Sequence, residues 1–369
     1  MLKLSVQFHI ITGLEAKIDN QEKEVLNMHR GKSNNKILRI VKKVAIFFAF
    51  EIIFTAIVFP CYIFYGPFTK VRNIIVSTSM ATMNHQYIAK TFLSKAKIDE
   101  ILKFDAKANN PTTTTNTVIQ QNINTIQTSK EDNSTEVIEL QGKKFHGKAI
   151  IIHDPYKVKV GYSSQLLTIG ETTSTIASRN NAIAAINGGG FYDISPDGKV
   201  GSGIGGVPIG IVMSEGNLIY PTKNVNLNEK MPCTMAINNE GHLIVGGPYS
   251  INDLMKMNVK EALSFSPTLV VNGTPYISET TVMGVNPRTA IGQRKNGDII
   301  FLTIDGRQAF ELGASLKDVQ GVMLELKAEN AMCLDGGSST TMYYKDEIIN
   351  KPSNMLGERS MPTIIYAEK

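Results

Sequence analysis

The sequence predicts an α+β fold for the part of the chain that follows residue 135. Short apolar runs there are separated by polar turns that contain glycine, as in "GIVMSEGNLIYP", "MAINNEGHLIVGG" and "TAIGQRKNGDIIFLTID". Serial hairpins of this kind favour antiparallel sheets, and Asn296–Gly297 is the strongest of the three turn signals. Two further segments indicate helices. We therefore expect a single outer domain, residues 136–369, of mixed and antiparallel sheets with a few helices, preceded by one transmembrane helix and a disordered tether.

The clearest helix is predicted in "SLKDVQGVMLELKA". Ser315 and Asp318 have the spacing of a capping box, which satisfies the free amide groups at a helix start. One face of this helix carries apolar side chains, at Val319, Val322, Met323 and Leu326. A shorter helix is expected in "TSTIASRNN", and "AIIIHDPYKVKVGYS" predicts a strand, a turn at Asp154 and Pro155, and a second strand.

Residues 44–65, "VAIFFAFEIIFTAIVFPCYIFY", are expected to form a transmembrane anchor that is not cleaved. A helix of this length spans roughly 33 Å, against about 30 Å for a bilayer core. Arg39, Lys42 and Lys43 precede it, so the positive-inside bias predicts a cytoplasmic amino terminus and an extracellular carboxy-terminal domain in the cell membrane. Its single charge, Glu51, either marks a partner helix or is an off-centre carboxylate, which we favour.

The segments around the anchor are expected to lack a fold of their own. Residues 1–43 form a basic cytoplasmic tail, in which Met28 offers an alternative start. Residues 66–104 are expected to be a stalk, helical in "HQYIAKTFLSKAKIDEILK". Residues 105–135 are rich in Thr, Asn and Gln and predict a flexible linker, because they hold too little apolar surface to offset the entropy of ordering.

Charge and cysteine content exclude several classes of protein. The formal net charge of +5 lies in residues 1–43, with nine basic against four acidic residues, and the rest has 29 of each. A neutral body argues against a nucleic-acid partner. Three cysteines are too few for a disulfide framework. Cys233 and Cys333 either pair or stay as two buried free thiols, and we expect free thiols.

Three stretches of the outer domain carry polar residues directly after an apolar strand: "AIAAINGGGFYD", "FLTIDGRQ" and "AMCLDGGSSTT". Side chains at strand ends are held rigidly while the loops beyond them are free to be shaped. Glycines permit positive φ and close approach of a ligand, and successive amides can hold an anion. We expect Gly188, Gly189 and Gly190 to clear space for a substrate beside Asn187 and Asp193. Taken one at a time, such turns are ordinary hairpin chemistry.

Arginines beside turn residues are the second indication of a site. Arg288, Arg307 and Arg359 offer a planar fork that suits phosphate or carboxylate, although each alone is typical of a surface ion pair. Scattered histidines give no metal motif, so no cofactor is expected, although a divalent ion at Asp193, Asp305 and Asp335 stays open. No GxSxG motif occurs, and Ser338 and Ser339 are interpreted as hydrogen-bond donors.

Taken together, "AINGGGFYD", "SPTLVVNG", "NPRTAIGQ", "TIDGR", "CLDGGSSTTM" and "ERSMP" resemble the phosphodiester glycosidase family over roughly residues 143–367. The resemblance implies hydrolysis of a sugar-1-phosphate diester, such as an N-acetylglucosamine-1-phosphodiester, at the sugar carbon. The free sugar is released and a phosphomonoester remains. The anchor and linker are similar to those of bacterial members related to exopolysaccharide, which implies a phosphodiester-linked glycan of the cell wall or capsule as partner.

The resemblance and the chemistry together assign expected roles. An oxocarbenium-like transition state needs a carboxylate near the anomeric carbon, and fixed positive charge stabilises a departing phosphate. Base or nucleophile candidates are Asp305 and Asp335, with Glu358 third. Asn187 and Asp193 are placed on sugar hydroxyls. Arg288, Arg307 and the amides of Gly336, Gly337 and Ser338 are placed on the phosphate. The substrate-binding set also includes Gly188, Gly189, Thr289 and Arg359.

Two other functions are compatible with the same residues. A non-catalytic surface module could bind phosphorylated wall polymer through the arginines and amides. A metal-dependent phosphodiesterase could cut the bond between phosphorus and oxygen at the aspartates. Release of free sugar distinguishes the glycosidase from the binding module. Sensitivity to a chelator and sugar-phosphate as product would indicate the phosphodiesterase.

Overall fold

The computed structural model describes residues 39–80, 86–101, 135–142, 145–192, 204–223, 225–231, 233–277, 284–308, 311–354 and 356–369. The chain divides into two compact units, residues 1–69 and 70–369. Several expectations fall outside the described residues: the tail up to residue 38 with Met28, the linker from residue 105 to residue 134, and Asp193.

The expected anchor lies within a helix of 27 residues, Arg39–Tyr65, whose most apolar window has a mean hydropathy of 2.4. By length and composition this helix can cross a membrane. The expected stalk holds α2 (Thr69–Met80), α3 (Gln86–Phe92) and a further helical stretch at residues 95–101. The helix expected after His85 is therefore broken at Leu93 and Ser94, and α2 was not anticipated.

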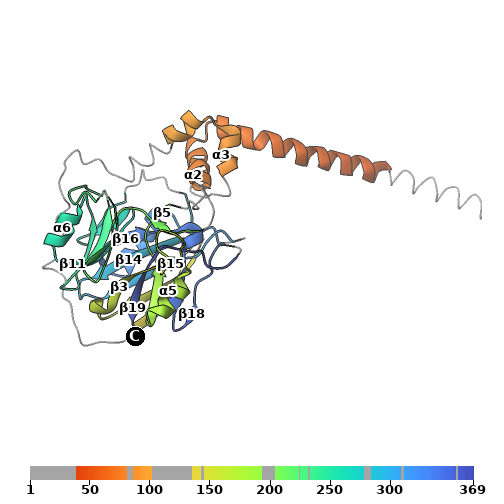
Figure 1. Ribbon diagram of the computed structural model, residues 1–369. Coiled ribbons are helices and arrows are strands. Elements are labelled where there is room, and N and C mark those ends of the chain that lie inside the picture. Colours follow the sequence, from red (N-terminus) through yellow and green to blue (C-terminus); the bar gives the residue numbers. More distant parts are fainter. Residues whose placement is uncertain are drawn as a thin grey trace, which may run out of the picture. The chain divides into compact units, whose positions relative to one another are not determined.

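Three antiparallel sheets make up the rest of the fold (Figure 1). The large sheet has the strand order β1 (Thr135–Gln141), β2 (His146–Ile152), β15 (Ile299–Ile304), β14 (Arg288–Arg294), β16 (Ala328–Leu334), β12 (Thr268–Val271), β13 (Thr274–Pro275). The second sheet has the order β10 (Leu243–Gly246), β9 (Thr234–Asn238), β11 (Val259–Ser264), β7 (Val212–Ser214), β8 (Asn217–Tyr220). The third has the order β18 (Glu347–Ile348), β17 (Met342–Tyr344), β4 (Ala182–Asn187), β19 (Thr363–Glu368), β3 (Val158–Tyr162). A small ribbon joins β5 (Phe191–Tyr192) to β6 (Val207–Pro208).

The main core lies where the three sheets face one another. Ile150 of β2, Phe301 of β15, Met235 of β9 and Ile186 of β4 all belong to it. Because successive strand residues point to opposite faces, the neighbours of Ile150 and Phe301 belong to a second core on the other face of the large sheet. Burial on both faces explains why these strands read as continuous apolar runs.

Each sheet has one helix on its outer face. Helix α7 (Leu316–Glu325) packs on the large sheet, α6 (Ile251–Lys256) on the second, and α5 (Thr173–Arg179) on the third. Two short 3₁₀ turns, η2 (Pro155–Lys157) and η3 (Gly337–Ser339), complete the described elements. The predicted α+β class is confirmed.

Local sequence signals account for much of this architecture. All three expected hairpins are present, as β7–β8, β9–β10 and β14–β15. The capping box of α7 forms between Ser315 and Asp318. Cys233 and Cys333 are buried free thiols, as expected. Helix α6 has its own capping box, between Ser250 and Asp253, which the sequence analysis missed.

Other parts of the chain pass close to the three consecutive glycines after β4: backbone beside Gly188 and Gly189, and the Phe265 ring beside Gly190. A Cβ on Gly188 would lie 2.5 Å from Thr363 Oγ1, and one on Gly189 would lie 2.8 Å from the carbonyl oxygen of Ser264. None of the three has positive φ. Their lack of a side chain therefore lets β4 approach its neighbours, and conformational freedom is not the reason.

Substituting Gly188→Ala should lower the free energy of unfolding by about 1 to 3 kcal/mol, the usual range for overpacking a core. The added methyl group would force β4 away from Thr363. Gly321→Ala is a matched control, because a Cβ there meets nothing within 4 Å and Gly321 lies inside α7. It should stabilise the protein by about 0.5 to 1 kcal/mol. Denaturant unfolding of the full chain in detergent measures both. A Gly188→Ala protein of unchanged stability and reduced substrate binding would instead support a direct contact between substrate and this turn.

Candidate active site

The expected site residues follow strand ends that share one edge of the large sheet. In the antiparallel register Arg288 pairs with Ile304 and Thr289 pairs with Leu334. The start of β14 and the ends of β15 and β16 therefore coincide. Arg288 begins β14, while Asp305 and Asp335 are the first residues after β15 and β16. Residues far apart in the sequence thus meet at this edge (Figure 1).

The end of β4 in the third sheet is bonded to the same edge. The amide of Asp335 donates to the carbonyl oxygen of Gly188 at 3.1 Å. Asn187 Nδ2 donates to the carbonyl oxygen of Asp335 at 2.6 Å, and Asn187 Oδ1 accepts from the Thr289 hydroxyl at 2.7 Å. Both side chains are fully buried. Asn187 and Thr289 therefore fasten the two sheets together at the site.

Arg288 is a buried cation whose hydrogen bonds go to backbone. Only 9% of the residue is exposed. Its Nε donates to the carbonyl oxygen of Ala314 at 3.1 Å and its Nη2 to that of Gly284 at 2.7 Å. Burial lowers the pKa of Arg288. Within the described part of the chain no carboxylate lies at ion-pair distance from it, so no ion pair balances its charge there.

Arg307 is held close to Arg288. Its Nη2 donates to Asn286 Oδ1 at 3.0 Å. Burial lowers the pKa of Arg307, and the neighbouring charges of Arg288 and Arg359 lower it further. A Cβ on Gly337 would lie 3.0 Å from Arg307 Nη2, so glycine at that position makes room for the guanidinium. The three arginines therefore form one group, which we call the arginine cluster.

The amides expected to hold the phosphate are partly committed elsewhere. The Gly337 amide donates to the carbonyl oxygen of Pro287 at 2.8 Å. The Gly336 amide acts on the carboxylate of Asp335, whose pKa it lowers. The Ser338 hydroxyl accepts from Arg359 at 3.4 Å, and the Arg359 guanidinium lies over the Phe191 ring at 4.7 Å. Of the expected amides, that of Gly337 is therefore already bonded to backbone.

Asp335 lies beside the arginine cluster. Burial raises the pKa of Asp335 to about 6, although the Ser339 hydroxyl, Arg359, the Gly336 amide and Arg307 all act in the opposite direction. A carboxyl with this pKa exchanges a proton near neutral pH, which is typical of groups that act in catalysis. The adjacent arginines also oppose binding of a divalent cation.

Only one of the two carboxylate oxygens of Asp305 accepts hydrogen bonds from the described residues. Its Oδ1 accepts from Asn350 Nδ2 and from the Lys351 amide, both at 3.0 Å. Only 5% of the residue is exposed, and burial raises the pKa of Asp305. Among the described residues no donor contacts Oδ2, so that oxygen can act on a substrate. Asn350 also donates to the carbonyl oxygen of Thr340, which ties Asp305 to the loop after β16.

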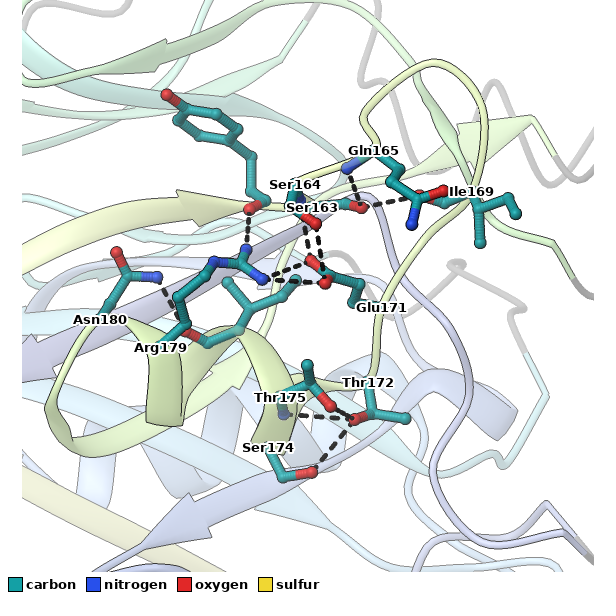
Figure 2. A network of polar contacts seen from close by, with 12 residues as sticks. Ser163, Ser164, Gln165, Ile169, Glu171, Thr172, Ser174, Thr175, Arg179 and Asn180 are labelled. Carbon is teal, nitrogen blue, oxygen red and sulfur yellow. Dashed lines mark hydrogen bonds and ion pairs between the residues drawn. The ribbon is translucent and has the colours of Figure 1, made fainter.

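The carboxylate of Glu358 is bonded to the start of helix α5. Its carboxylate accepts from the amide of Ser174 at 2.9 Å and also from the Ser174 hydroxyl. Ser174 lies in the first turn of α5, where Thr172 accepts from the amide of Thr175 (Figure 2). A carboxylate there stabilises the free amides of a helix start. The position of Glu358 is therefore explained by a helix-capping role, without a catalytic one.

Metal-binding groups and cavities away from the arginine cluster are two other kinds of site that the described residues could form. No group of three or more His, Cys, Asp or Glu with metal-binding geometry occurs in the described part of the chain. Two cavities, of about 320 and 590 Å³, lie beside β3 and beside α7, and neither is lined by an expected site residue. Sequence reasoning missed Asn350, and also the contact between His146 Nδ1 and Glu311 Oε1 at 2.7 Å. Their partners are too distant in the sequence for any pattern to reveal them.

A model of the phosphodiester glycosidase family matches residues 180–368, just over half of the chain. The chain belongs to this family. The matched region contains Asn187, the arginine cluster and both aspartates. The resemblance stated from the motifs is therefore confirmed.

One solved structure supports the fold of this phosphodiester glycosidase, and two other proteins show weaker similarity. The structure is similar to the catalytic domain of zebrafish N-acetylglucosamine-1-phosphodiester alpha-N-acetylglucosaminidase, auto-inhibited by its pro-peptide, at a TM-score of 0.54 and 22% identity over 66% of this chain and 87% of that one. A hypothetical protein from Synechocystis matches with a TM-score of 0.46, at 15% identity over 63% of this chain and 61% of that one. In sequence, the SPbeta prophage-derived protein YomE of Bacillus subtilis is 24% identical over 53% of this chain, which spans only 29% of that relative.

Proposed function

We propose that this phosphodiester glycosidase hydrolyses a sugar-1-phosphate diester at the anomeric carbon. Water adds to the sugar, the bond from the anomeric carbon to the phosphate oxygen breaks, and a phosphomonoester leaves. The observation that carries the proposal is the arginine cluster beside Asp335 at the edge where β14, β15 and β16 meet. Family membership supports the glycosidase class of reaction.

The arginine cluster would bind the phosphate. A diester carries one negative charge, and the departing monoester gains a second one. Charge that grows during the reaction is stabilised most by groups fixed in place beforehand. Arg288 and Arg307 meet this requirement, because backbone carbonyls and Asn286 hold them.

The two aspartates would divide the remaining work. Ionised Asp305 would face the anomeric carbon as base or nucleophile, with Oδ1 fixed and Oδ2 directed at the sugar. Asp335 would share a proton with the leaving phosphate, because its pKa of about 6 matches the second pKa of a phosphomonoester, which is also near 6. Since kcat/KM then needs Asp305 ionised and Asp335 protonated, we expect an optimum on the acid side of neutral pH.

The membrane helix suggests where this reaction would take place. We place residues 1–43 in the cytoplasm and the domain outside the cell membrane, supported by the basic residues that precede the apolar segment. The substrate there would be a phosphodiester-linked glycan of the wall or exopolysaccharide. Accessibility of an added glycosylation or protease site after residue 135 tests the orientation.

Incubation of the full chain in detergent with a panel of sugar-1-phosphodiesters tests the proposed activity. Free sugar together with a phosphomonoester supports it. Binding without any product supports the surface-module alternative. Sugar-1-phosphate as product, lost on adding a chelator, supports the phosphodiesterase alternative.

A further inference from the structure

The contact between His146 and Glu311 lies beside Asp305 and outside every motif that led to the site. His146 is the first residue of β2, and its carbonyl oxygen accepts from the amide of Asp305 at 2.8 Å. Its ring Nδ1 lies 2.7 Å from Glu311 Oε1. One residue therefore contacts the backbone of Asp305 and the side chain of Glu311.

Glu311 is fixed in place by the turn that carries it. The Gln308 amide donates to the carbonyl oxygen of Glu311 at 3.0 Å, and the Glu311 amide donates back to that of Gln308 at 3.3 Å. At the base of this turn a Cβ on Gly306 would lie 2.6 Å from Gly313 Cα, so the two segments of backbone are in contact there. The same turn holds Arg307, whose amide donates to the carbonyl oxygen of Leu312.

The carboxylate of Glu311 is unusual because one of its two oxygens has no hydrogen-bond donor among the described residues. Its side chain is 18% exposed, while Oε2 is buried and has no hydrogen-bond partner among the described residues. Leaving such an oxygen without a donor is unfavourable, because the buried acceptor has lost its hydrogen bonds to water. A purely structural link to His146 does not require a second, unpaired carboxylate oxygen, because an amide side chain could accept the same hydrogen bond.

The charge of Glu311 acts on Asp305. Burial is the main cause that raises the pKa of Asp305, and the nearby negative charge of Glu311 raises it further. The bonds from Asn350 and Lys351, and the charge of Lys351, act in the opposite direction. The charged groups that face Asp305 in the described structure are thus Glu311, with its partner His146, and Lys351.

We propose that Glu311, oriented by His146, is a positioning residue that sets the protonation of Asp305 through its fixed negative charge. This inference rests on the proposed function, which needs ionised Asp305 at the anomeric carbon. Glu311 and His146 need not touch the substrate. They raise the pH below which Asp305 can no longer act as base or nucleophile, in addition to the larger effect of burial.

The pH dependence of kcat/KM in a Glu311→Gln variant tests the proposal. Glutamine keeps the acceptor for His146 and removes the charge. Asp305 should then ionise more readily, so the acid limb should move to lower pH by about 0.5 unit or more. Glu240→Gln is the matched control, because Glu240 pairs with His242 at 3.3 Å in the β9–β10 turn. Its acid limb should stay in place. An unchanged acid limb in Glu311→Gln would overturn the proposal.

A second measurement separates this inference from the proposed function. The carboxyl ¹³C resonance of Asp305, assigned with the Asp305→Asn variant, reports its pKa without any turnover. A fall in the pKa of Asp305 in Glu311→Gln supports the inference, even if no sugar phosphodiester is cleaved. Equal pKa values in the two proteins would contradict it, even if the enzyme is active.

Discussion

Asp305→Asn should reduce kcat/KM on a sugar-1-phosphodiester by at least about 10³-fold, which corresponds to roughly 4 kcal/mol of transition-state stabilisation. The amide keeps the size of the carboxylate but can neither attack the sugar nor accept a proton from water. Asn350 and the Lys351 amide would still hold Oδ1, so the fold should be retained. Turnover of purified variants, measured with their thermal unfolding, gives the result.

Asp298→Asn provides the matched control for this variant. Asp298 is also a buried aspartate, it lies just before the opposite end of β15, and it pairs with His153 and Arg294. This substitution should lower stability and leave kcat/KM within a few-fold of the wild type. An Asp305→Asn enzyme that retains full activity would remove Asp305 from the mechanism.

Arg307→Ala should lower kcat/KM by about 10² to 10³-fold, the usual loss when one fixed donor to a developing negative charge is removed. Arg307→Lys should recover only part of this loss, since lysine lacks the planar fork that binds two phosphate oxygens. The effect should be larger for a phosphodiester than for an aryl glycoside of the same sugar, because the aryl leaving group makes no use of the cluster. Steady-state kinetics on the two substrates measure it.

Arg294→Ala serves as the control for loss of an arginine. Arg294 is the last residue of β14, the seven-residue strand that begins with Arg288. It donates hydrogen bonds to Asp298 and to the carbonyl oxygen of Leu326. Its removal should affect stability more than catalysis. Equal losses of activity in the two alanine variants would show that the arginine cluster has no special part in phosphate recognition.

Local signals in the sequence were sufficient for much of the fold. Glycine turns between apolar runs predicted three hairpins, and Ser315 with Asp318 predicted the start of α7, because these interactions involve residues only a few positions apart. The order of strands within each sheet could not be obtained in this way. It depends on long-range pairings such as β2 with β15.

The sequence predicted most of the residues that form the candidate site, but only partly what each of these residues does. Polar residues after β15 and β16 and at the start of β14 converge because these antiparallel strands end at one edge. The contacts of the other candidates depend on partners that no motif reveals. Ser174, which donates to Glu358, lies 184 positions earlier in the chain. Residue 188 is glycine because Thr363 leaves no room for a side chain there.

Hydrolysis in H₂¹⁸O is the most direct test of cleavage at the anomeric carbon. The full chain is incubated with a sugar-1-phosphodiester, and both products are analysed by mass spectrometry at short times, before the free sugar exchanges its anomeric oxygen. The proposed mechanism predicts the label in the hydroxyl group of the released sugar and unlabelled phosphomonoester. Label in the phosphate would show that the bond between phosphorus and oxygen breaks, and would contradict the account.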